Sequence, residues 1–325
     1  MRSKGSIIMA ENILVAKYAP QLKALSPNYD EQISLDDSEP IEFENSENVL
    51  MAFACIADTH LVNKEVCASN LNNFFLDIGN SKETVDAFLM AGDISEYGTK
   101  GEYDRFFSVL DKQKVIPHAF ITMGNHDVRL LFKRNQRIIM DKVNQYLNTD
   151  TKGKSYYSYD VKGYTFIVIG TDKRVFERAY ISPQQIEFLD KELASATAEG
   201  KPAFVMCHQA MSNTHGLPEV WKGGDIGAQS QQVREVIEKY KNVLYINGHL
   251  HGGIFEKTFE TINEERCIYS ISIPGYRKLN NFGNKDCGIG YYCCVYKDKL
   301  VLKARNFARG KNVEGEYTQF VIELK

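Results

Sequence analysis

The chain has 325 residues, of which 43% are hydrophobic and 25% are charged, and its net charge is −3. This composition predicts an ordinary packed core of one large domain or two modest ones. It excludes the overall basic field of a nucleic-acid-binding protein, and no apolar stretch approaches the length of a membrane span.

The first part of the chain is acidic. Residues 24–63 contain no Lys or Arg, and eight acidic side chains lie between Asp30 and Glu47. We therefore predict that residues 1–47 form an acidic N-terminal extension, with one short helix over residues 11–25. The simpler interpretation of the charge run is a solvated linker. The alternative is a segment that folds back across a basic active-site mouth.

From Val49 onward, short apolar runs alternate with amphipathic segments. Strands are predicted at 53–57, 86–91, 119–123, 203–207 and 243–246, helices at 68–78, 102–110, 131–147 and 229–240, and a hairpin at 156–159 and 164–169. Ser182 and Pro183 are typical of the first positions of a further helix. After His251 the pattern predicts consecutive strands at 254–259, 267–273, 291–296, 300–307 and 318–324. Helix-alternating strands followed by a meander indicate a mixed α/β fold, with a pair of sheets flanked by helices.

Five of the buried runs end on a residue that can hold a metal ion. These residues are Asp58, Asp93, Asn125, His208 and His249. In open α/β sheets ligands bind beyond the carboxyl ends of the strands, so the five side chains are expected at one edge of the sheets. Gly92, Gly124 and Gly248 precede three of them, where Gly allows a sharp turn and a close approach. Ordinary strand-end turns explain any single one of these glycines equally well.

Five of the seven histidines fall into the same segments. They are His60, His126, His208, His249 and His251. Taken singly, an Asp after a strand is typical of a helix N-cap, and a His near an apolar run is typical of a structural residue. Taken together, carboxylates, imidazoles and an amide without thiolates suit divalent Mn, Fe or Zn. They are too many for one tetrahedral ion, whereas two ions that share a bridging carboxylate would use them economically.

Five sequence blocks occur in a characteristic order: Asp58-Thr59-His60, Gly92-Asp93, Gly124-Asn125-His126-Asp127, His208 and Gly248-His249-Leu250-His251. This order resembles that of the calcineurin-like metallophosphoesterase superfamily. The resemblance implies a four-layer αββα sandwich of two mixed β-sheets flanked by helices, with a dinuclear metal site at the sheet ends. It also implies a catalytic core at 48–275, with a C-terminal β segment at 276–325 that completes the same domain.

The resemblance assigns a role to each block residue. One ion would be held by Asp58, His60 and His251, the other by Asn125, His208 and His249, and Asp93 would bridge them. A metal-bridging hydroxide would then attack phosphorus in line. His126 would face the phosphoryl group, with Asp127 beside it as an orienting carboxylate. For Asp127, a local salt bridge to Arg129 is an equal alternative.

The block that follows Gly92 bears on the substrate. Phosphoprotein phosphatases of the superfamily carry GDxVDRG, whose Arg contacts phosphate, but here Glu96 and Tyr97 stand in place of the Asp-Arg pair. The block is more similar to the class III cyclic-nucleotide phosphodiesterase branch, which favours a phosphodiesterase. The alternatives are a phosphomonoesterase on the same ions, a catalytically silent metal-binding scaffold, and a nuclease. The absence of a basic and aromatic strip argues against a nuclease.

The substrate pocket is expected to involve residues 211–227, a loop with Gly, Asn and Ser that follows His208. His215 is interpreted as an exposed loop residue, with substrate contact as the alternative, and Trp221 either stacks on a base or packs. Arg277 and Lys278 could bind phosphate, although solvated charge is the simpler interpretation. The expected partner is a small-molecule phosphate ester, with nucleotides as one candidate class, and neither a membrane nor a nucleic acid is expected.

The cysteines bear on the compartment. There are seven, an odd number, and no CxxC pair occurs. A disulfide framework is therefore not expected. The start at Met1–Ala10 has a basic flank but lacks the longer apolar segment of a secretory signal. Both features favour a cytoplasmic location.

Overall fold

The computed structural model describes residues 31–277, 283 and 286–325, and it contains two β-sheets. The strands of the seven-stranded sheet are β1 Met51–Ile56, β2 Ala87–Met90, β3 His118–Ile121, β10 Ile289–Val295, β11 Lys299–Asn306, β12 Lys311–Asn312 and β13 Gln319–Glu323. Their order is β12-β11-β10-β1-β2-β3, and β13 pairs with β11. The strands of the six-stranded sheet are β4 Tyr157–Val161, β5 Tyr164–Val168, β6 Ala203–Met206, β7 Val243–Asn247, β8 Phe259–Asn263 and β9 Ile268–Ser272. Their order is β4-β5-β6-β7-β9-β8.

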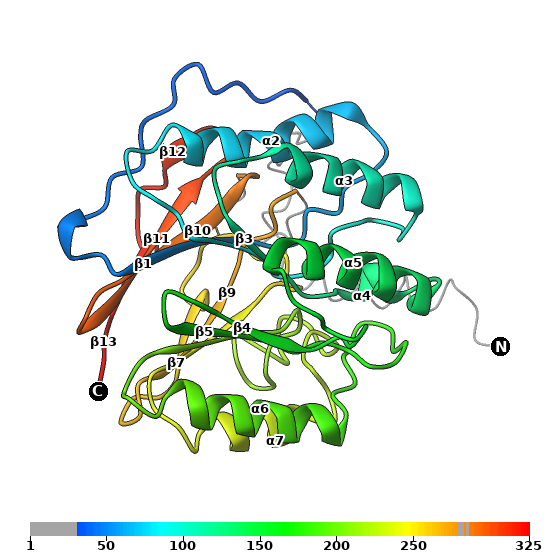
Figure 1. Cartoon of the computed structure of the whole chain (residues 1–325), viewed down its shortest axis with the longest axis vertical. Helices are drawn as coiled ribbons and strands as arrows, with labels where there is room; N and C mark the ends of the chain where they lie inside the picture. The colour runs from blue at the N-terminus through cyan, green and yellow to red at the C-terminus, as the bar shows by residue number, and fades with distance from the viewer. Residues whose placement is uncertain (1–30, 278–282, 284–285) are drawn as a thin grey trace.

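Helices cover the outer face of each sheet (Figure 1). They are α2 Glu65–Gly79, α3 Lys100–Lys112, α4 Asn125–Val128, α5 Phe132–Leu147, α6 Pro183–Ala196 and α7 Ser230–Ile237, and a short 3-10 turn, η1, spans Ser46–Asn48. The helices α2 and α3 lie over the seven-stranded sheet, and α6 and α7 lie over the six-stranded sheet. The predicted αββα sandwich is therefore confirmed.

Both sheets are mixed. In the first, β1, β2 and β3 are parallel, while β10 runs antiparallel to β1. In the second, β5, β6, β7 and β9 are parallel, while β4 and β8 are antiparallel to their neighbours. Strands β1, β2, β6 and β7 are buried along their whole length, because helices or the other sheet cover both of their faces. This explains why they appear in the sequence as continuous apolar runs.

Aromatic side chains join the two sheets. The ring of Phe53 on β1 meets Phe166 on β5 and Phe204 on β6 edge-on, with centroid distances of 5.4 and 4.8 Å. All three side chains are fully buried. Burial of each contributes about 1.5–3 kcal/mol, and the edge-to-face geometry adds about 0.5–1.5 kcal/mol a pair. The sheets are thus held in one relative position, which fixes the distance between the loops at their ends.

The structure differs from the prediction after His251. The strand expected at 254–259 is wrong, because Phe255 and Thr258 form a turn there: Thr258 donates its N–H to the Phe255 carbonyl at 2.9 Å. Strand β8 begins only at Phe259, and all five of its residues are at least partly exposed, so it carries no apolar signal. The expected meander is also divided, since β8 and β9 join the second sheet and β10, β11 and β13 join the first.

The described part of the acidic extension is packed against the first sheet and its helix. Ile33, Ile41 and Phe43 are buried. The Ile33 N–H donates to Asn70 Oδ1 on α2 at 3.0 Å, and Lys303 Nζ on β11 lies 2.6 Å from Glu44 Oε1. Residues 31–44 are therefore packed rather than a free linker, whereas the acidic side chains from Glu31 to Glu47 are exposed, as the solvated interpretation expects. The helix expected at 11–25 lies outside the described residues, and the domain boundary at residue 47 stays a prediction.

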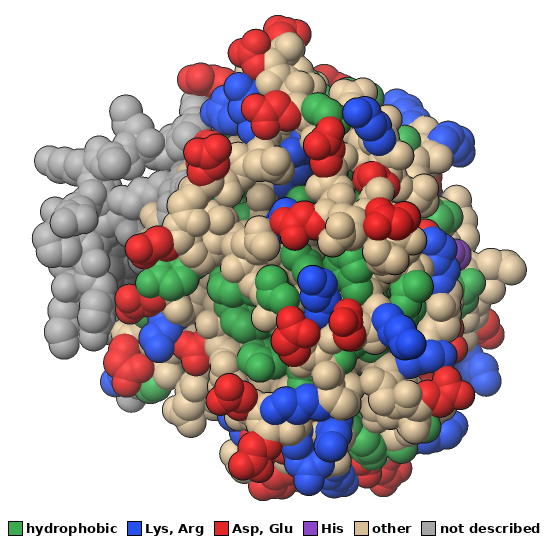
Figure 2. Space-filling view, turned by 90° about the vertical axis from the view of Figure 1, so that its left-hand side faces the viewer, with side chains coloured by type: hydrophobic (Ala, Val, Ile, Leu, Met, Phe, Trp, Pro, Cys, Tyr) green, Lys and Arg blue, Asp and Glu red, His purple; other side chains and the backbone are tan. Residues whose placement is uncertain are grey.

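Charges of both signs are interspersed over the face of the molecule shown in Figure 2, with hydrophobic side chains visible between them. All seven cysteines lie in the described part of the chain, where each is buried with a free thiol. No helix in residues 31–277 or 286–325 combines the length and the apolar character that a membrane crossing requires.

Candidate metal centre

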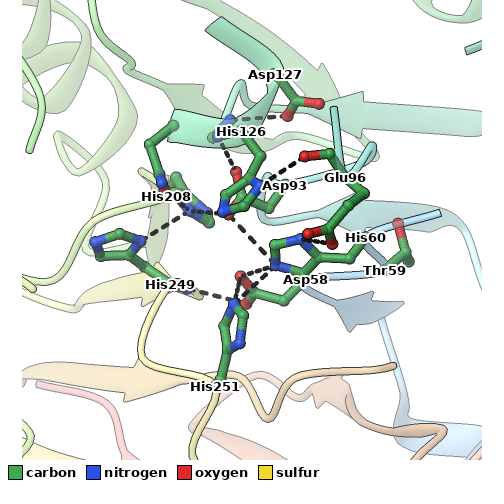
Figure 3. A network of polar contacts seen from close by, with 12 residues as sticks. Asp58, Thr59, His60, Asp93, Glu96, His126, Asp127, His208, His249 and His251 are labelled. Atoms are coloured by element: carbon green, nitrogen blue, oxygen red, sulfur yellow. Dashed lines mark hydrogen bonds and ion pairs between the residues drawn. The ribbon is translucent and has the colours of Figure 1, made fainter. Parts of the chain in front are cut away.

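The predicted ligands meet at the carboxyl ends of the central strands (Figure 3). Asp58 and His60 follow β1, Asp93 follows β2, and Asn125 begins α4 after β3. From the other sheet, His208 follows β6, and His249 and His251 follow β7. Parallel strands end at the same edge of a sheet, so the two sheets bring together side chains as distant in the sequence as Asp58 and His251.

One group of ligand atoms lies around Asp58. His251 Nε2 is 3.1 Å from Asp58 Oδ1 and 2.8 Å from His60 Nε2. Asp93 Oδ2 is 3.5 Å from His60 Nε2. One donor atom from each of these four residues lies within 4.8 Å of the others, close enough to surround a single cation.

A second group lies around His208. Its Nε2 is 3.3 Å from Asp93 Oδ2, 3.1 Å from Asn125 Oδ1 and 3.1 Å from His249 Nδ1. The same Asp93 oxygen therefore belongs to both groups, and it lies between His60 and His208. The two groups are adjacent and share one carboxylate, as in a dinuclear centre.

The donor set fits two metal ions. Within the described part of the chain, Asp58 Oδ1 and His249 Nε2 are buried without a hydrogen-bond partner. Buried polar atoms of this kind are rare, because each loses its hydration without compensation. The nitrogens of His60 and His251 face each other, as do those of His208 and His249. A cation in each group would bind Asp58 Oδ1 and lie between the facing nitrogens, whereas His249 Nε2, on the other side of its ring from Nδ1, would not contact it.

The charges of the centre depend on burial and on neighbours. Burial lowers the pKa of His60 to about 4, so this ring is neutral at pH 7 and able to bind a metal. Burial also disfavours the charged form of His208, but the Asp93 carboxylate outweighs that effect and raises its pKa to about 9. In turn, His208 holds the pKa of Asp93 well below its ordinary value, although burial acts in the opposite direction. A metal ion would replace the shared proton of this pair.

Five of the seven predicted ligands have a left-handed backbone. Their φ values are 56° for Asp58, 38° for His60, 51° for Asp93, 71° for His249 and 51° for His251. Such a conformation costs about 1–3 kcal/mol for a residue with a side chain, and it persists where the surroundings over-determine it. Here Asp58 Oδ2 accepts the His249 N–H at 2.9 Å, and the Asp93 carbonyl accepts the His60 N–H at 3.0 Å. The loops thus hold each other in the strained form that points the side chains inward.

Two glycines permit the close approach of these loops. Gly92 has φ +87°, and a Cβ there would lie 2.4 Å from His208 Nδ1. Gly124 has ordinary φ, but its Cβ would lie 2.0 Å from Asp93 Oδ1. A side chain at either position would displace a predicted ligand.

His126 adjoins the centre from the first turn of α4. Its backbone N–H donates to Asp93 Oδ1 at 2.8 Å, and its Nδ1 lies 2.7 Å from the Glu96 carbonyl. The Glu96 carboxylate in turn lies 3.1 Å from His60 Nδ1. Glu96 therefore contacts both a predicted ligand and the predicted catalytic histidine. From the sequence, Glu96 was recognised only as a departure from another motif, and its position three residues after Asp93 was the available signal.

Asp127 contacts the backbone around the centre. Its buried carboxylate accepts the N–H groups of Gly124, Ile94 and Ser95 at 3.0–3.2 Å and the Tyr103 hydroxyl at 3.2 Å. Burial raises the pKa of Asp127 to about 6. The expected alternative, a salt bridge to Arg129, is wrong, because Arg129 pairs with Glu177 at 3.0 Å. Glu177 also accepts from Asn125 Nδ2 at 2.8 Å, a contact that no sequence pattern indicated.

With this geometry established, comparison with known proteins is decisive for the family. The sequence model of the calcineurin-like phosphoesterases matches residues 51–253, well over half of the chain. This chain belongs to the calcineurin-like phosphoesterase family. The matched range contains all seven predicted ligands together with His126 and Asp127. No curated protein matches the chain significantly.

Two solved structures share the fold of this calcineurin-like phosphoesterase. A dimetal phosphatase from Danio rerio has a TM-score of 0.62 and 15% sequence identity, and the match covers 85% of this chain and all of that one. The purple acid phosphatase PPD1 from yellow lupin has a TM-score of 0.61 and 15% identity, and the match covers 84% of this chain and 53% of that one. At this identity the likeness shows the fold alone.

The remaining candidates of this phosphoesterase lie as follows. His215 is buried, with its nitrogens 2.7 Å from the Lys257 carbonyl and from Ser270 Oγ, so the exposed-loop interpretation is wrong. The Trp221 ring is partly buried against the His249 ring, with a centroid distance of 4.4 Å. Arg277 donates to the His60 carbonyl at 2.7 Å and is therefore not merely solvated. Lys278 lies outside the described residues.

Proposed function

We propose that this calcineurin-like phosphoesterase is a dinuclear-metal-dependent phosphoric ester hydrolase that acts on phosphodiesters. The observation that carries the proposal is the shared carboxylate: Asp93 Oδ2 lies 3.5 Å from His60 Nε2 and 3.3 Å from His208 Nε2, between two groups of unpaired or facing donors. The family match supports the hydrolase class.

The proposed assignment follows the two groups of ligands. Asp58, His60 and His251 would hold one ion, and Asn125, His208 and His249 would hold the other. Asp93 would be common to both. Oxygen and nitrogen donors without thiolates favour Mn, Fe or Zn, in divalent or mixed-valence pairs. When bound, such ions supply an activated water nucleophile and neutralise the charge of the phosphate group.

The surrounding residues would position the substrate and the ligands. His126 would face the phosphoryl group with its Nε2. Its Nδ1 is already bonded to the Glu96 carbonyl, so Nε2, which lies 3.3 Å from Arg129 Nη2, is the nitrogen that a substrate would contact. Glu96 would orient His60 in the way that carboxylates commonly orient metal-bound histidines. Asp127 would keep His126 in place through the backbone of α4 and of residues 94–95.

A phosphodiester substrate is favoured by the sequence around Asp93, where Glu96 and Tyr97 replace the Asp-Arg pair of phosphoprotein phosphatases, as in the class III cyclic-nucleotide branch. The second candidate is phosphomonoester hydrolysis, favoured by the Arg129 guanidinium at 3.3 Å from His126 Nε2, because a cation there suits a dianion. Among small-molecule esters, nucleotides are compatible with the Trp221 ring beside His249. Seven reduced cysteines are consistent with the cytoplasm.

The test uses metal-free protein loaded separately with Mn²⁺, Fe²⁺ or Zn²⁺. Turnover of bis(4-nitrophenyl) phosphate is compared with that of 4-nitrophenyl phosphate, and bound metal is counted by elemental analysis. We expect about two ions per chain and faster turnover of the diester. A strong preference for the monoester would reverse the proposed specificity, and failure of both esters with every metal would refute the hydrolase.

Asp93→Ala tests the shared carboxylate. One side chain serves both groups, so the variant is expected to lose metal and turnover together, by at least about 10²-fold in turnover. Asp190→Ala, which changes a half-buried carboxylate on the outer helix α6 that pairs with Lys239, is the matched control and should retain both. Full activity of Asp93→Ala would contradict the bridging assignment.

A further inference from the structure

Arg129 and Glu177 form an ion pair at the edge of the metal centre. Arg129 Nη2 lies 3.0 Å from Glu177 Oε1, and the two side chains are 39% and 32% exposed. The predicted ligands from Asp58 to His249 are at most 2% exposed. Arg129 and Glu177 are therefore both next to the centre and reachable from solvent.

The hydrogen bonds of His126 determine what Arg129 contacts. A carbonyl oxygen only accepts, so the His126 Nδ1 that lies 2.7 Å from the Glu96 carbonyl must carry a proton. In the neutral ring Nε2 then has a lone pair, and Arg129 Nη2 donates to it at 3.3 Å. The guanidinium therefore gives only a long, weak hydrogen bond to His126 Nε2, beside the two groups of predicted metal ligands. A phosphate oxygen is a stronger acceptor than an imidazole nitrogen and would take over that N–H.

Glu177 fixes two groups at once. While Oε1 accepts from Arg129, Oε2 accepts from Asn125 Nδ2 at 2.8 Å. This bond orients the Asn125 amide with Oδ1 toward His208, at 3.1 Å. The Glu177 carbonyl also accepts from Gln209 Nε2 at 3.2 Å, which ties the residue to the segment after β6. One carboxylate therefore couples the position of the guanidinium to that of a predicted metal ligand.

Arg178, the residue after Glu177, lies outside the contacts that Arg129 makes beside the centre. Its guanidinium lies 3.6 Å from Asp225 and donates to the Lys222 carbonyl at 2.8 Å, so its contacts are with the 211–227 loop. It is 50% exposed and makes none of the contacts of Arg129 within the described residues. Arg266, an exposed arginine between β8 and β9 that donates to the Lys239 carbonyl at 3.0 Å, provides a matched cation at the amino end of β9, opposite the end of the sheet that bears the centre.

We propose that Arg129 binds the phosphoryl oxygens of the substrate and that Glu177 is its positioning residue. A planar guanidinium can give two parallel N–H groups to one phosphate, which suits this role better than an ammonium. When phosphate binds, Arg129 gives up its hydrogen bond to His126 Nε2, donates to a phosphate oxygen instead, and keeps its ion pair with Glu177. His126 Nε2 is then free to face the ester. The proposal rests on the proposed function and adds to it the residue that anchors the phosphate.

The experiment compares Arg129→Met, Arg129→Lys, Glu177→Gln and the control Arg266→Met, all loaded with the same metal. Steady-state kinetics give KM and kcat, and calorimetry gives the affinity for inorganic phosphate. Arg129→Met should weaken phosphate binding and raise KM by about 10- to 100-fold, the range that loss of a charge-assisted hydrogen bond produces. Arg129→Lys should recover only part of this loss. Arg266→Met should stay within about twofold of the wild type, and all variants should keep their metal.

Glu177→Gln separates positioning from binding. It should shift KM and phosphate affinity in the same direction as Arg129→Met but less, because the guanidinium remains. Chemical rescue is the second measurement: millimolar guanidinium should restore part of the activity of Arg129→Ala and none of that of Glu177→Gln.

Unchanged phosphate affinity in Arg129→Met with full metal content would overturn the inference, because a merely structural ion pair gives that result. Failure of the proposed function is distinct from this outcome. It would appear as wild-type protein that binds two metals and phosphate but hydrolyses neither ester, and the calorimetric comparison of Arg129→Met would still decide the role of Arg129.

Discussion

Several residues of the metal centre destabilise the folded protein when no metal ion is bound. Asp58 and Asp93 are buried carboxylates, and five ligands have positive φ, which together cost several kcal/mol of folding free energy. The rest of the fold must supply that energy until ions bind, and bound ions would return it as added stability of the native state. Strain of this kind is typical of positions under functional rather than structural constraint.

His126 gives a test at this scale that separates catalysis from metal binding. Its side chain contacts Glu96 and Arg129, while its backbone N–H holds Asp93, so His126→Ala removes the ring and leaves the Asp93 contact. We expect full metal content and a kcat lower by about 10²–10⁴-fold, the usual contribution of a general acid or base. Elemental analysis and steady-state kinetics measure the two quantities.

The control is His118→Gln on β3, a partly exposed histidine outside the centre, which should behave as the wild type. If His126→Ala released metal, His126 would be a ligand and the proposed division of roles would be incorrect.

At the scale of elements, the strand ends were predictable and the loop contacts were not. Buried parallel strands are continuous apolar runs, so their ends, and with them Asp58, Asp93 and His208, could be located from the sequence. No periodicity marks β8, whose residues are all at least partly exposed. Glu177 lies 52 residues after Asn125, in the loop that follows β5, and β5 packs against β3 through the rings of Phe166 and Phe120. Contacts between loops depend on the whole fold, which a local pattern does not contain.

The 211–227 loop is anchored by His215, and this anchor is expected to depend on pH. Burial lowers the pKa of His215 to about 4, whereas an unfolded histidine has a pKa of about 6.5. Between these values the unfolded chain binds more protons, so the contribution of neutral His215 is full above pH 6.5 and declines as the pH falls toward 4. At pH 5 the loss amounts to about 2 kcal/mol, since one pKa unit corresponds to about 1.36 kcal/mol.

Urea unfolding of metal-free wild type and His215→Gln at pH 7.5 and pH 5.0 measures this effect. The variant cannot titrate at this position, so the stability difference between the two proteins should shrink by about 2 kcal/mol at the lower pH. The comparison cancels the titration of the metal-ligand histidines, which both proteins share. An equal difference at both pH values would show that residue 215 does not link folding to protons.

At the scale of the whole molecule, a buried ion pair joins three parts of the chain. Arg305 on β11 contacts both oxygens of Asp77 on α2 at 2.6 Å, and it also donates to the Glu39 carbonyl of the N-terminal segment. Both side chains are fully buried. The acidic segment 31–47, the outer helix α2 and strand β11 are therefore connected at one point, by residues up to 266 positions apart in the sequence.

Removal of one member of this pair should weaken the fold strongly. Asp77→Ala leaves the Arg305 guanidinium buried without its carboxylate, which costs about 3–5 kcal/mol in comparable cases. The double variant Asp77→Ala/Arg305→Met should recover part of that loss, because it removes the uncompensated charge and refills the space with an apolar side chain.

Urea unfolding gives the free energies of unfolding of these variants. Limited proteolysis should show that residues 31–47 become cleavable in Asp77→Ala first, since the Glu39 contact depends on the same guanidinium. A single variant that loses less than about 1 kcal/mol would mean that water reaches Arg305 once Asp77 is gone, and that the segment is held by Ile33, Ile41 and Phe43 instead.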